Sequence, residues 1–193
     1  MSELIKFPAG TVFLKNVRIS FCDAIYVAKQ YKGQGKPKYG ATLLITPGSD
    51  NDLKIEKAIA EVAAAQWGEK TASVMASIVG QSKSYCYLNG DLKEYDGYAG
   101  MKALSTARRE EDGPVLVLDR DTTPLTQASG RPYGGCYVNA RVQLWAQKNE
   151  WGNGMRATLV VVQFMNDGDS FGGASKPTNA GFESVEDEAA DLV

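Results

Sequence analysis

Polar and apolar side chains alternate without interruption between Cys136 and Gln147. The even-numbered positions are apolar, and the odd-numbered positions are polar or aromatic. Because successive side chains of a strand point to opposite faces, this pattern predicts a strand with one buried face. Residues 149–154 contain the turn-forming run Gly-Asn-Gly, and the apolar segment 155–164 follows it. We therefore expect a hairpin whose second strand is buried on both faces and central in its sheet.

The polar face of the first strand carries Tyr137, Arg141 and Trp145 at every fourth position, with amide side chains between them. A merely solvated face would carry lysine, glutamate, threonine and serine. An aromatic and cationic stripe is typical of surfaces that stack bases and hold phosphates. Tyrosine and tryptophan are also common at core edges and protein interfaces, so a structural oligomer contact through this stripe is an open alternative.

Upstream, the apolar positions of residues 11–22 change parity between Leu14 and Val17. Such a shift indicates a β-bulge or a sharp bend, of the kind that closes small barrels. Arg18 then lies on the face opposite the neighbouring apolar side chains. Residues 29–38, KQYKGQGKPK, are rich in lysine and glycine. Their composition favours a flexible basic loop, and an ordinary solvated hairpin is the alternative.

A second alternating strand at residues 39–45 leads into a helical pattern. Ser49 is a suitable N-cap with Asp52 three residues later, and apolar side chains then recur at helical spacing as far as Trp67. Another helical piece is expected at residues 71–79. These apolar stripes are typical of core packing, and we assign them no chemistry.

The composition changes between Gln81 and Arg109, where tyrosines interleave with cationic side chains. Every base offers a π-face, so this mixture suits single-stranded nucleic acid, in which each stacked base contributes about 1–3 kcal/mol. A tyrosine-rich loop that packs on the helix is the alternative. Residues 101–108 and, further along, 115–118 are also expected to form short strands. The tyrosines are Tyr85, Tyr87, Tyr95 and Tyr98, and the cations are Lys83, Lys93, Lys102, Arg108 and Arg109.

With 193 residues, the chain is long enough for one domain with a full core and appendages. It contains no histidine, which removes the usual general base and the commonest metal ligand. Its three cysteines, Cys22, Cys86 and Cys136, are widely spaced, which argues against a disulfide framework and a zinc site. We expect no cofactor. Without a membrane-length apolar run or the apolar core of a signal peptide, we expect a cytoplasmic protein with no membrane partner.

Charge is distributed unevenly along the chain. Residues 167–193 hold seven acidic side chains and one lysine, a net charge of −6, whereas the other 166 residues hold 20 basic and 16 acidic ones, a net charge of +4. A basic body with an acidic tail is typical of nucleic-acid-binding proteins. We expect residues 1–166 to form one binding domain with a helical insert at about 49–80. Residues 167–193 are expected to form a disordered linker and acidic tail.

This acidic tail ends in apolar residues, and two tasks are open to it. It can mimic the phosphate chain and compete with a nucleic acid for the body, or it can offer a short acidic and apolar peptide to partner proteins. The residues expected to carry these contacts are Phe182, Glu183, Glu186, Asp187, Glu188, Asp191, Leu192 and Val193.

Asp119 and Asp121 lie two residues apart in the run LDRDTTP. Paired acids at this spacing suit a divalent metal, which supports a metal-dependent nuclease or recombination enzyme as an alternative function. However, Arg120 separates them, and neither a carboxylate cluster nor a histidine is near in the sequence. The pattern therefore favours a protein without catalysis.

Several runs of residues carry a family resemblance. They are RPYGGCYVNA at Arg131 to Ala140, GMRATL at Gly154 to Leu159, VQF before Gly168, PVLV from Pro114, and the opening strand around Val17 and Phe21. The sequence resembles the phage-encoded single-stranded DNA-binding proteins of the OB-fold type. The resemblance implies a mainly β fold with a five-stranded Greek-key barrel, binding of single-stranded DNA without sequence readout, and an acidic C-terminal tail.

These patterns together favour a single-stranded DNA-binding protein that acts in phage DNA replication, recombination or repair. Replication or recombination proteins are the expected partners of its tail, and a homodimer is compatible with the sequence. Aromatic side chains would stack bases, and cationic ones would neutralise phosphates. The candidate DNA-binding residues are Arg18, Lys36, Lys38, Lys83, Tyr85, Tyr87, Lys93, Tyr95, Tyr98, Lys102, Arg108, Arg131, Tyr133, Tyr137, Arg141 and Trp145.

Overall fold

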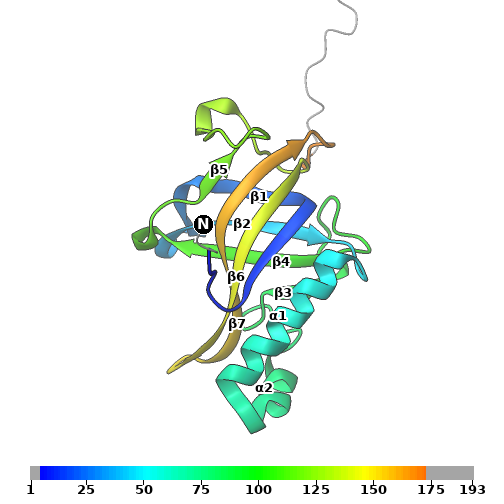
Figure 1. The fold of residues 1–193 in the computed structure, drawn as a ribbon, viewed down its shortest axis with the longest axis vertical. Helices are drawn as coiled ribbons and strands as arrows, with labels where there is room; N and C mark the ends of the chain where they lie inside the picture. The colour runs from blue at the N-terminus through cyan, green and yellow to red at the C-terminus, as the bar shows by residue number, and fades with distance from the viewer. Residues whose placement is uncertain (1–4, 173–193) are drawn as a thin grey trace, which may run out of the picture.

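The computed structural model describes residues 5–172, so the tail assignments from Phe182 to Val193 lie outside the described residues. Within this range, seven strands form one sheet in the order β3-β4-β2-β1-β6-β7-β5 (Figure 1). All neighbouring strands are antiparallel except β5 and β7, which run parallel. Figure 1 shows the helices α1 and α2 together on one side of the strands. The fold is therefore mainly β with a helical insert, as expected.

The expected C-terminal hairpin is confirmed as β6 (Tyr137–Asn149) and β7 (Gly152–Asn166). Even-numbered side chains of β6 from Val138 to Leu144 are buried, and the odd-numbered ones reach the surface. The expectation that the second strand is central and buried on both faces is wrong. Beyond β7 lies only the three-residue strand β5 (Leu116–Leu118), and side chains such as Thr158 on the other face of β7 stay partly exposed.

The bulge predicted in the first strand is confirmed. In β1 (Thr11–Tyr31) the pairing with β6 shifts register between Leu14 and Val17, where Asn16 has a φ of 53°. The Asn16 backbone N–H donates to the side-chain oxygen of Asn139 on β6, at 3.0 Å. This bond gives the bulged N–H an acceptor where the ladder is interrupted.

Residues 29–38 form a hairpin, and the expectation of a flexible loop is wrong. β1 and β2 (Gln34–Ile45) both extend through this segment. Lys32 and Gly33, with φ of 49° and 69°, make the turn. Two consecutive positive φ values are those of a type I′ turn, whose twist matches that of the flanking strands. The basic side chains of this segment therefore project from a paired ribbon.

The helical insert begins where the capping pattern predicts. α1 (Asp50–Trp67) is capped by Ser49, whose side chain accepts the backbone N–H of Asp52 at 3.3 Å. α2 (Thr71–Ile78) follows after the short 3-10 helix Gly68–Lys70. The apolar stripe of α1, including Ile55 and Ile59, is buried in the core formed with the sheet.

The five-stranded closed barrel implied by the resemblance needs correction, because the described residues form a seven-stranded sheet that is not closed by continuous strand pairing. One isolated bridge, between Tyr85 and Met155, joins the segment before β3 to β7. Two of the strands, β3 (Tyr87–Asn89) and β5, have only three residues each. β4 (Lys102–Arg109) confirms the short strand expected at residues 101–108. β5 confirms the short strand expected at residues 115–118. The sequence pattern did not predict β3, because a three-residue strand is too short to show alternation.

Candidate nucleic-acid interface

Three adjoining hollows follow β1, β2 and β4, with volumes of about 700, 260 and 680 Å³. The first and second share Phe21 and Tyr95 among their lining residues. The second and third share Ser82 and Ser105. We call this run of hollows the groove. A surface of this length and form suits an extended ligand better than a compact small molecule.

Phe21 and Tyr95 form the aromatic wall between the first two hollows. Their ring centroids are 4.9 Å apart in an edge-to-face arrangement, and the two side chains are 53% and 49% exposed. Phe21 has a φ of 49° and follows Ser20, where the pairing of β1 with β2 shifts register. This irregularity turns the ring out of the core, and the exposed wall offers ring faces for stacking.

The third hollow combines one exposed tryptophan with three cations. Trp145 is 42% exposed, and its Nε1 donates to Thr158 Oγ1 at 3.1 Å, which fixes the orientation of the ring. Arg156, opposite Trp145 in the β6–β7 register, donates from Nη2 to the Lys83 carbonyl at 2.7 Å. The other two cations, Lys38 and Arg109, face each other in the β2–β4 register. The arrangement is one in which a base can stack while phosphates meet cations.

The guanidinium of Arg109 already has anionic partners in this hollow. Asp112 accepts its Nε and Nη2 at 2.8 and 2.9 Å, and Glu111 lies 3.0 Å from Nη1. This hydrogen bonding lowers the pKa of the exposed Asp112 carboxyl. A phosphate that binds Arg109 must therefore compete with these two carboxylates.

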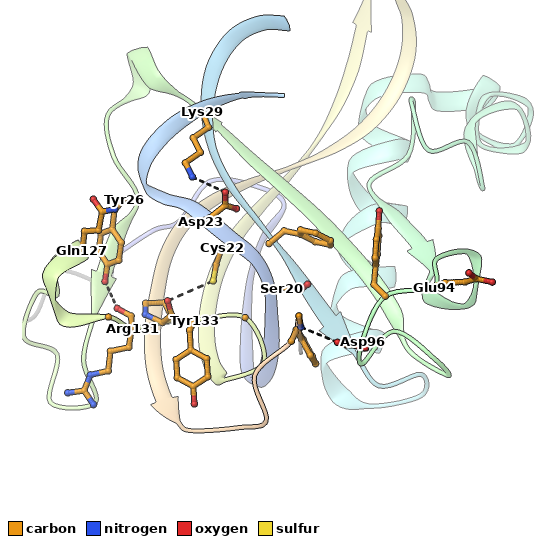
Figure 2. A pocket seen from close by; sticks show the side chains of 17 residues that line it. Ser20, Cys22, Asp23, Tyr26, Lys29, Glu94, Asp96, Gln127, Arg131 and Tyr133 are labelled. Atoms are coloured by element: carbon orange, nitrogen blue, oxygen red, sulfur yellow. Dashed lines mark hydrogen bonds and ion pairs between the residues drawn. The ribbon is translucent and has the colours of Figure 1, made fainter. Parts of the chain in front are cut away.

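The cations of the first hollow are also paired. Lys29 lies 2.9 Å from Asp23 (Figure 2), and Arg131 Nη2 lies 2.8 Å from Asp119. The Tyr26 hydroxyl donates to the Arg131 backbone carbonyl at 2.6 Å, and burial is the main cause of its raised pKa. The first hollow is thus the more aromatic end of the groove and the third is the more cationic end.

Tyr87, Tyr98 and Lys102 do not present themselves to a ligand as the sequence suggested. Tyr87 and Tyr98 are 7% and 3% exposed, so their ring faces are covered by protein. The Tyr87 hydroxyl donates to Asp52 at 2.7 Å, and Lys102 Nζ contacts Asp52 at 2.9 Å and Glu56 at 2.6 Å. Tyr87 and Lys102 thus join β3 and β4 to α1. This matches the alternative interpretation, in which the tyrosine-rich segment packs on the helix.

Asp52 is the centre of this buried network. Burial pushes the pKa of its carboxyl upward, but hydrogen bonds from the Gly48 backbone N–H, Tyr87 and Lys102 bring the pKa below its ordinary value. In the opposite direction, burial and the Asp52 carboxylate strongly raise the pKa of Tyr87. The network is therefore ionised at Asp52 and Lys102 and protonated at Tyr87 at neutral pH.

Arg18, Tyr133 and Tyr137 come together, but they are covered by residues 167–172, which we call the strap. Arg18 Nη2 donates to the Asp169 carbonyl at 2.7 Å, and its guanidinium lies 4.3 Å from the Phe171 ring centroid and 5.6 Å from that of Tyr137. The Tyr133 hydroxyl donates to the Asp167 carboxylate at 2.7 Å.

The remaining candidates are divided between the groove and other surfaces. The guanidinium of Arg141 lies 5.1 Å from the Phe7 ring centroid, and Arg108 Nε donates to the Gly113 carbonyl at 2.8 Å; both are outside the groove lining. The exposed Lys36 and Lys83 do not line the groove either. The candidates that do line it are Lys38, Tyr85, Lys93, Tyr95, Tyr98, Arg131, Tyr133 and Trp145.

Three groove residues are absent from the sequence-derived set. Phe21 looked like a core position of an alternating strand, because the irregularity that exposes it leaves no mark in the apolar pattern. Arg156 is a single cation in a strand that looked apolar. The one signal for it is its position opposite Trp145 across the predicted hairpin. Arg109 stood out in composition beside Arg108, although only Arg109 lines the groove.

The two carboxylates of the metal-dependent alternative have local partners. Asp119 contacts Arg131, and Asp121 accepts the backbone N–H and hydroxyl of Thr123 at 3.0 and 2.6 Å. Across residues 5–172 there is no group of three or more acidic, cysteine or histidine side chains placed to hold a metal ion. The described part of the chain also contains no helix long and apolar enough to cross a membrane.

A mainly antiparallel sheet with an aromatic and cationic groove defines the class of β proteins that bind nucleic-acid strands. A family model described as the single-stranded DNA-binding protein of Enterobacter phage Enc34 matches residues 10–193. The chain therefore belongs to the Enc34 single-stranded DNA-binding protein family. A relative from Acyrthosiphon pisum secondary endosymbiont phage 1, putative protein p50, is 42% identical over 177 residues, which are 90% of each chain.

Solved structures share this fold. The single-stranded DNA-binding protein from bacteriophage Enc34 in complex with ssDNA superposes with a TM-score of 0.66 and 26% identity, covering 84% of this chain and 90% of that one. The bacteriophage T7 protein gp2.5, also a single-stranded DNA-binding protein, gives a TM-score of 0.53 with 13% identity over 91% and 98% of the two chains. At that identity, the T7 likeness concerns the fold alone.

Proposed function

We propose that this protein binds single-stranded DNA along the groove, without reading its sequence. Exposed rings of Phe21, Tyr95 and Trp145 stack bases, and Lys38 and Arg156 hold phosphates. Stacking tolerates any base because each has a π-face. The observation that carries the proposal is the third hollow, where a fixed, exposed tryptophan stands among cations. The family membership and the ssDNA complex of the similar Enc34 protein support it.

The groove contains few cations that lack an anionic partner, so electrostatic binding is modest. Lys38, Lys93 and Arg156 have no carboxylate partner among the ion pairs of residues 5–172, whereas Arg109 has two and Arg131 and Lys29 have one each. Each phosphate neutralised on a single strand contributes about 0.7 to the slope of log affinity against log salt. The proposal therefore includes a shallow salt dependence, of a few phosphates per protomer.

The acidic tail is proposed to compete with DNA for the groove and to recruit replication or recombination proteins of a phage in its bacterial host. The described chain ends at Gly172, which lines the first hollow and whose backbone N–H donates to Asp96 at 3.0 Å. Residues 173–193 carry five acidic side chains and one lysine, a net charge of −4. The tail therefore starts at the groove and repels the phosphate chain.

A comparison of single-stranded and duplex oligonucleotides tests the proposal. Fluorescence anisotropy of a labelled thymidine 30-mer should show saturable binding that weakens as salt is raised, and a duplex of equal length should bind far more weakly. The same labelled strand, incubated with magnesium or manganese and separated by size, should stay intact. Equal binding of strand and duplex, or cleavage of the strand, would overturn the proposal.

A further inference from the structure

The strap is held against the sheet by hydrogen bonds from both of its ends. Phe171 N–H donates to the Gly134 carbonyl at 2.9 Å, and Gly168 N–H lies 3.2 Å from the Tyr133 hydroxyl. Arg18 bridges strand and strap, since its Nε donates to the Gly135 carbonyl at 3.0 Å while Nη2 reaches the strap. Arg18, Gly97 and residues 133–135 lie against the strap, and we call them its seat. The strap and its seat form one wall of the first hollow, which Tyr133, Gly134 and Phe171 line.

Glycines in the seat make this close approach possible. A Cβ on Gly135, which has a φ of 104°, would collide with the Asp169 carbonyl, and one on Gly97 would collide with the Phe171 ring. A Cβ on Gly168 would collide with the Gly135 carbonyl. Gly135 of the RPYGGCYV motif thus makes room for the strap, which approaches the residues before β6 closely because this position lacks a side chain.

Three contacts that the strap makes have a counterpart in a nucleotide. The Asp169 carbonyl gives Arg18 an oxygen acceptor, as a phosphate would. The Asp167 carboxylate gives the Tyr133 hydroxyl an anionic acceptor. The Phe171 ring covers the Arg18 guanidinium at 4.3 Å, as a stacked base would. A phosphate is a better partner for a guanidinium than a neutral carbonyl, because it adds the attraction of a full negative charge to the hydrogen bond.

We propose that the strap covers a latent nucleotide subsite formed by Arg18, Tyr133 and Tyr137, and that single-stranded DNA held in the groove displaces it. Phe171 leaves the guanidinium, a base takes its place, and a phosphate takes the place of the Asp169 carbonyl. The strap is tethered beside its seat and so has a high effective concentration. Only a strand already bound along the groove competes with it, whereas a very short oligonucleotide leaves it in place.

This inference rests on the proposed function, and amide exchange separates the two. Exchange rates of the Gly168, Phe171 and Gly172 amides would be measured by NMR with and without a saturating thymidine 30-mer, with tryptophan emission followed in parallel. Displacement predicts exchange at least about tenfold faster at these amides. The Leu144 amide, bonded to the Gly10 carbonyl at 2.8 Å, is the internal reference and should not speed up.

The outcomes are distinguishable. Faster strap exchange together with quenched tryptophan emission supports the subsite. Unchanged or slower strap exchange with quenched emission makes the strap a fixed wall and overturns this inference alone. The absence of any DNA effect on emission, anisotropy or exchange overturns the proposed function.

A substitution gives an independent test. Phe171→Ala weakens the strap, so it should raise the affinity for a thymidine 30-mer about fivefold, which is the scale of one cation–π contact. It should leave the affinity for a thymidine hexamer unchanged. Phe13→Ala removes a similar ring, 45% exposed and outside the groove lining, and serves as the matched control. Weaker binding of the 30-mer by the Phe171 variant, with a folded protein by circular dichroism, would contradict displacement.

Discussion

The Asp112 carboxylate accepts both Nε and Nη2 of Arg109, three residues earlier, at 2.8 and 2.9 Å. This two-point contact pairs the guanidinium of Arg109, a cation of the groove, with a carboxylate of the protein itself. Asp112→Asn should therefore leave Glu111 as the one carboxylate beside the guanidinium, raise ssDNA affinity about threefold and steepen the salt slope by about 0.7. Anisotropy titrations over a salt series would measure both quantities.

The control for this variant removes an equal charge elsewhere. Asp121→Asn neutralises a carboxylate that is bonded only within its own turn to Thr123. An equal gain in affinity from Asp121→Asn would show that net charge, and not the release of Arg109, causes the effect.

Arg156 tests the cationic end of the groove by loss of binding. Its Nε bonds to Gln147 at 3.0 Å, and its guanidinium lies beside Trp145 in the third hollow. Arg156→Gln should lower ssDNA affinity about tenfold and reduce the salt slope by about 0.7, because one phosphate contact is lost. Lys57→Gln on the exposed face of α1 removes the same charge outside the groove, and its affinity should stay close to that of the unmodified protein. Equal losses in both variants would contradict a localised site.

Asp52 gives a prediction on the stability of the fold and not on DNA binding. The side chain is 5% exposed and joins α1 to Tyr87 and Lys102, so Asp52→Ala should lower the free energy of unfolding by about 3 kcal/mol. Urea denaturation at pH 7 measures this. Glu56→Gln removes the more exposed partner of Lys102 and should cost below about 1 kcal/mol. Similar losses for the two variants would contradict the central role of Asp52.

The Asp52 carboxylate also determines the direction in which the stability of the folded protein changes with pH. The pKa of Asp52 is lower in the folded protein than in the unfolded chain, so its contribution is complete above the unfolded value of about 4 and is lost as the pH falls through the folded value. Thermal unfolding between pH 7 and pH 3 should show the stability gap between the protein and Asp52→Asn narrow at acidic pH. A gap that widens on acidification would refute this assignment.

Removal of residues 173–193 tests the proposed competition by the tail. The truncated protein keeps the strap but loses a net charge of −4. Its ssDNA affinity should exceed that of the full chain most strongly at low salt, and the difference should shrink as screening increases. Equal affinities at low salt would remove the competition hypothesis and leave partner recruitment as the role of the tail.

Most elements of the fold follow from the sequence, whereas the shortest strand and the pairing of distant strands do not. Alternation over β6 and the parity shift at Leu14 and Val17 predicted strand faces and a bulge that the structure confirms. Ser49 marked the start of α1. By contrast, β3 is too short to carry a period, and the sequence did not predict that β5 pairs with β7, a distant segment, in parallel. Local pattern contains no information about such a pairing.

The binding surface was predictable in kind but not residue by residue. Aromatic and cationic composition pointed to segments that contribute to the groove, and Trp145 and Lys38 are among the residues that line it. Tyr98 and Arg18 show why composition alone fails. Tyr98 packs in a small core with Leu44, and Arg18 is held by a strap more than a hundred residues distant in the chain. Burial and long-range contacts decide which rings and cations remain available.

The three tryptophans allow the most direct test of the central claim, because Trp67, Trp145 and Trp151 are 8%, 42% and 84% exposed and Trp145 alone of the three lines the groove. Emission would be followed during titration with a thymidine 30-mer, for Trp145→Phe and Trp151→Phe. We predict that quenching persists in Trp151→Phe and is largely lost in Trp145→Phe, which should also bind several-fold more weakly, since stacking contributes about 1–3 kcal/mol per base. Undiminished quenching and affinity in Trp145→Phe would contradict a DNA-binding site in this groove.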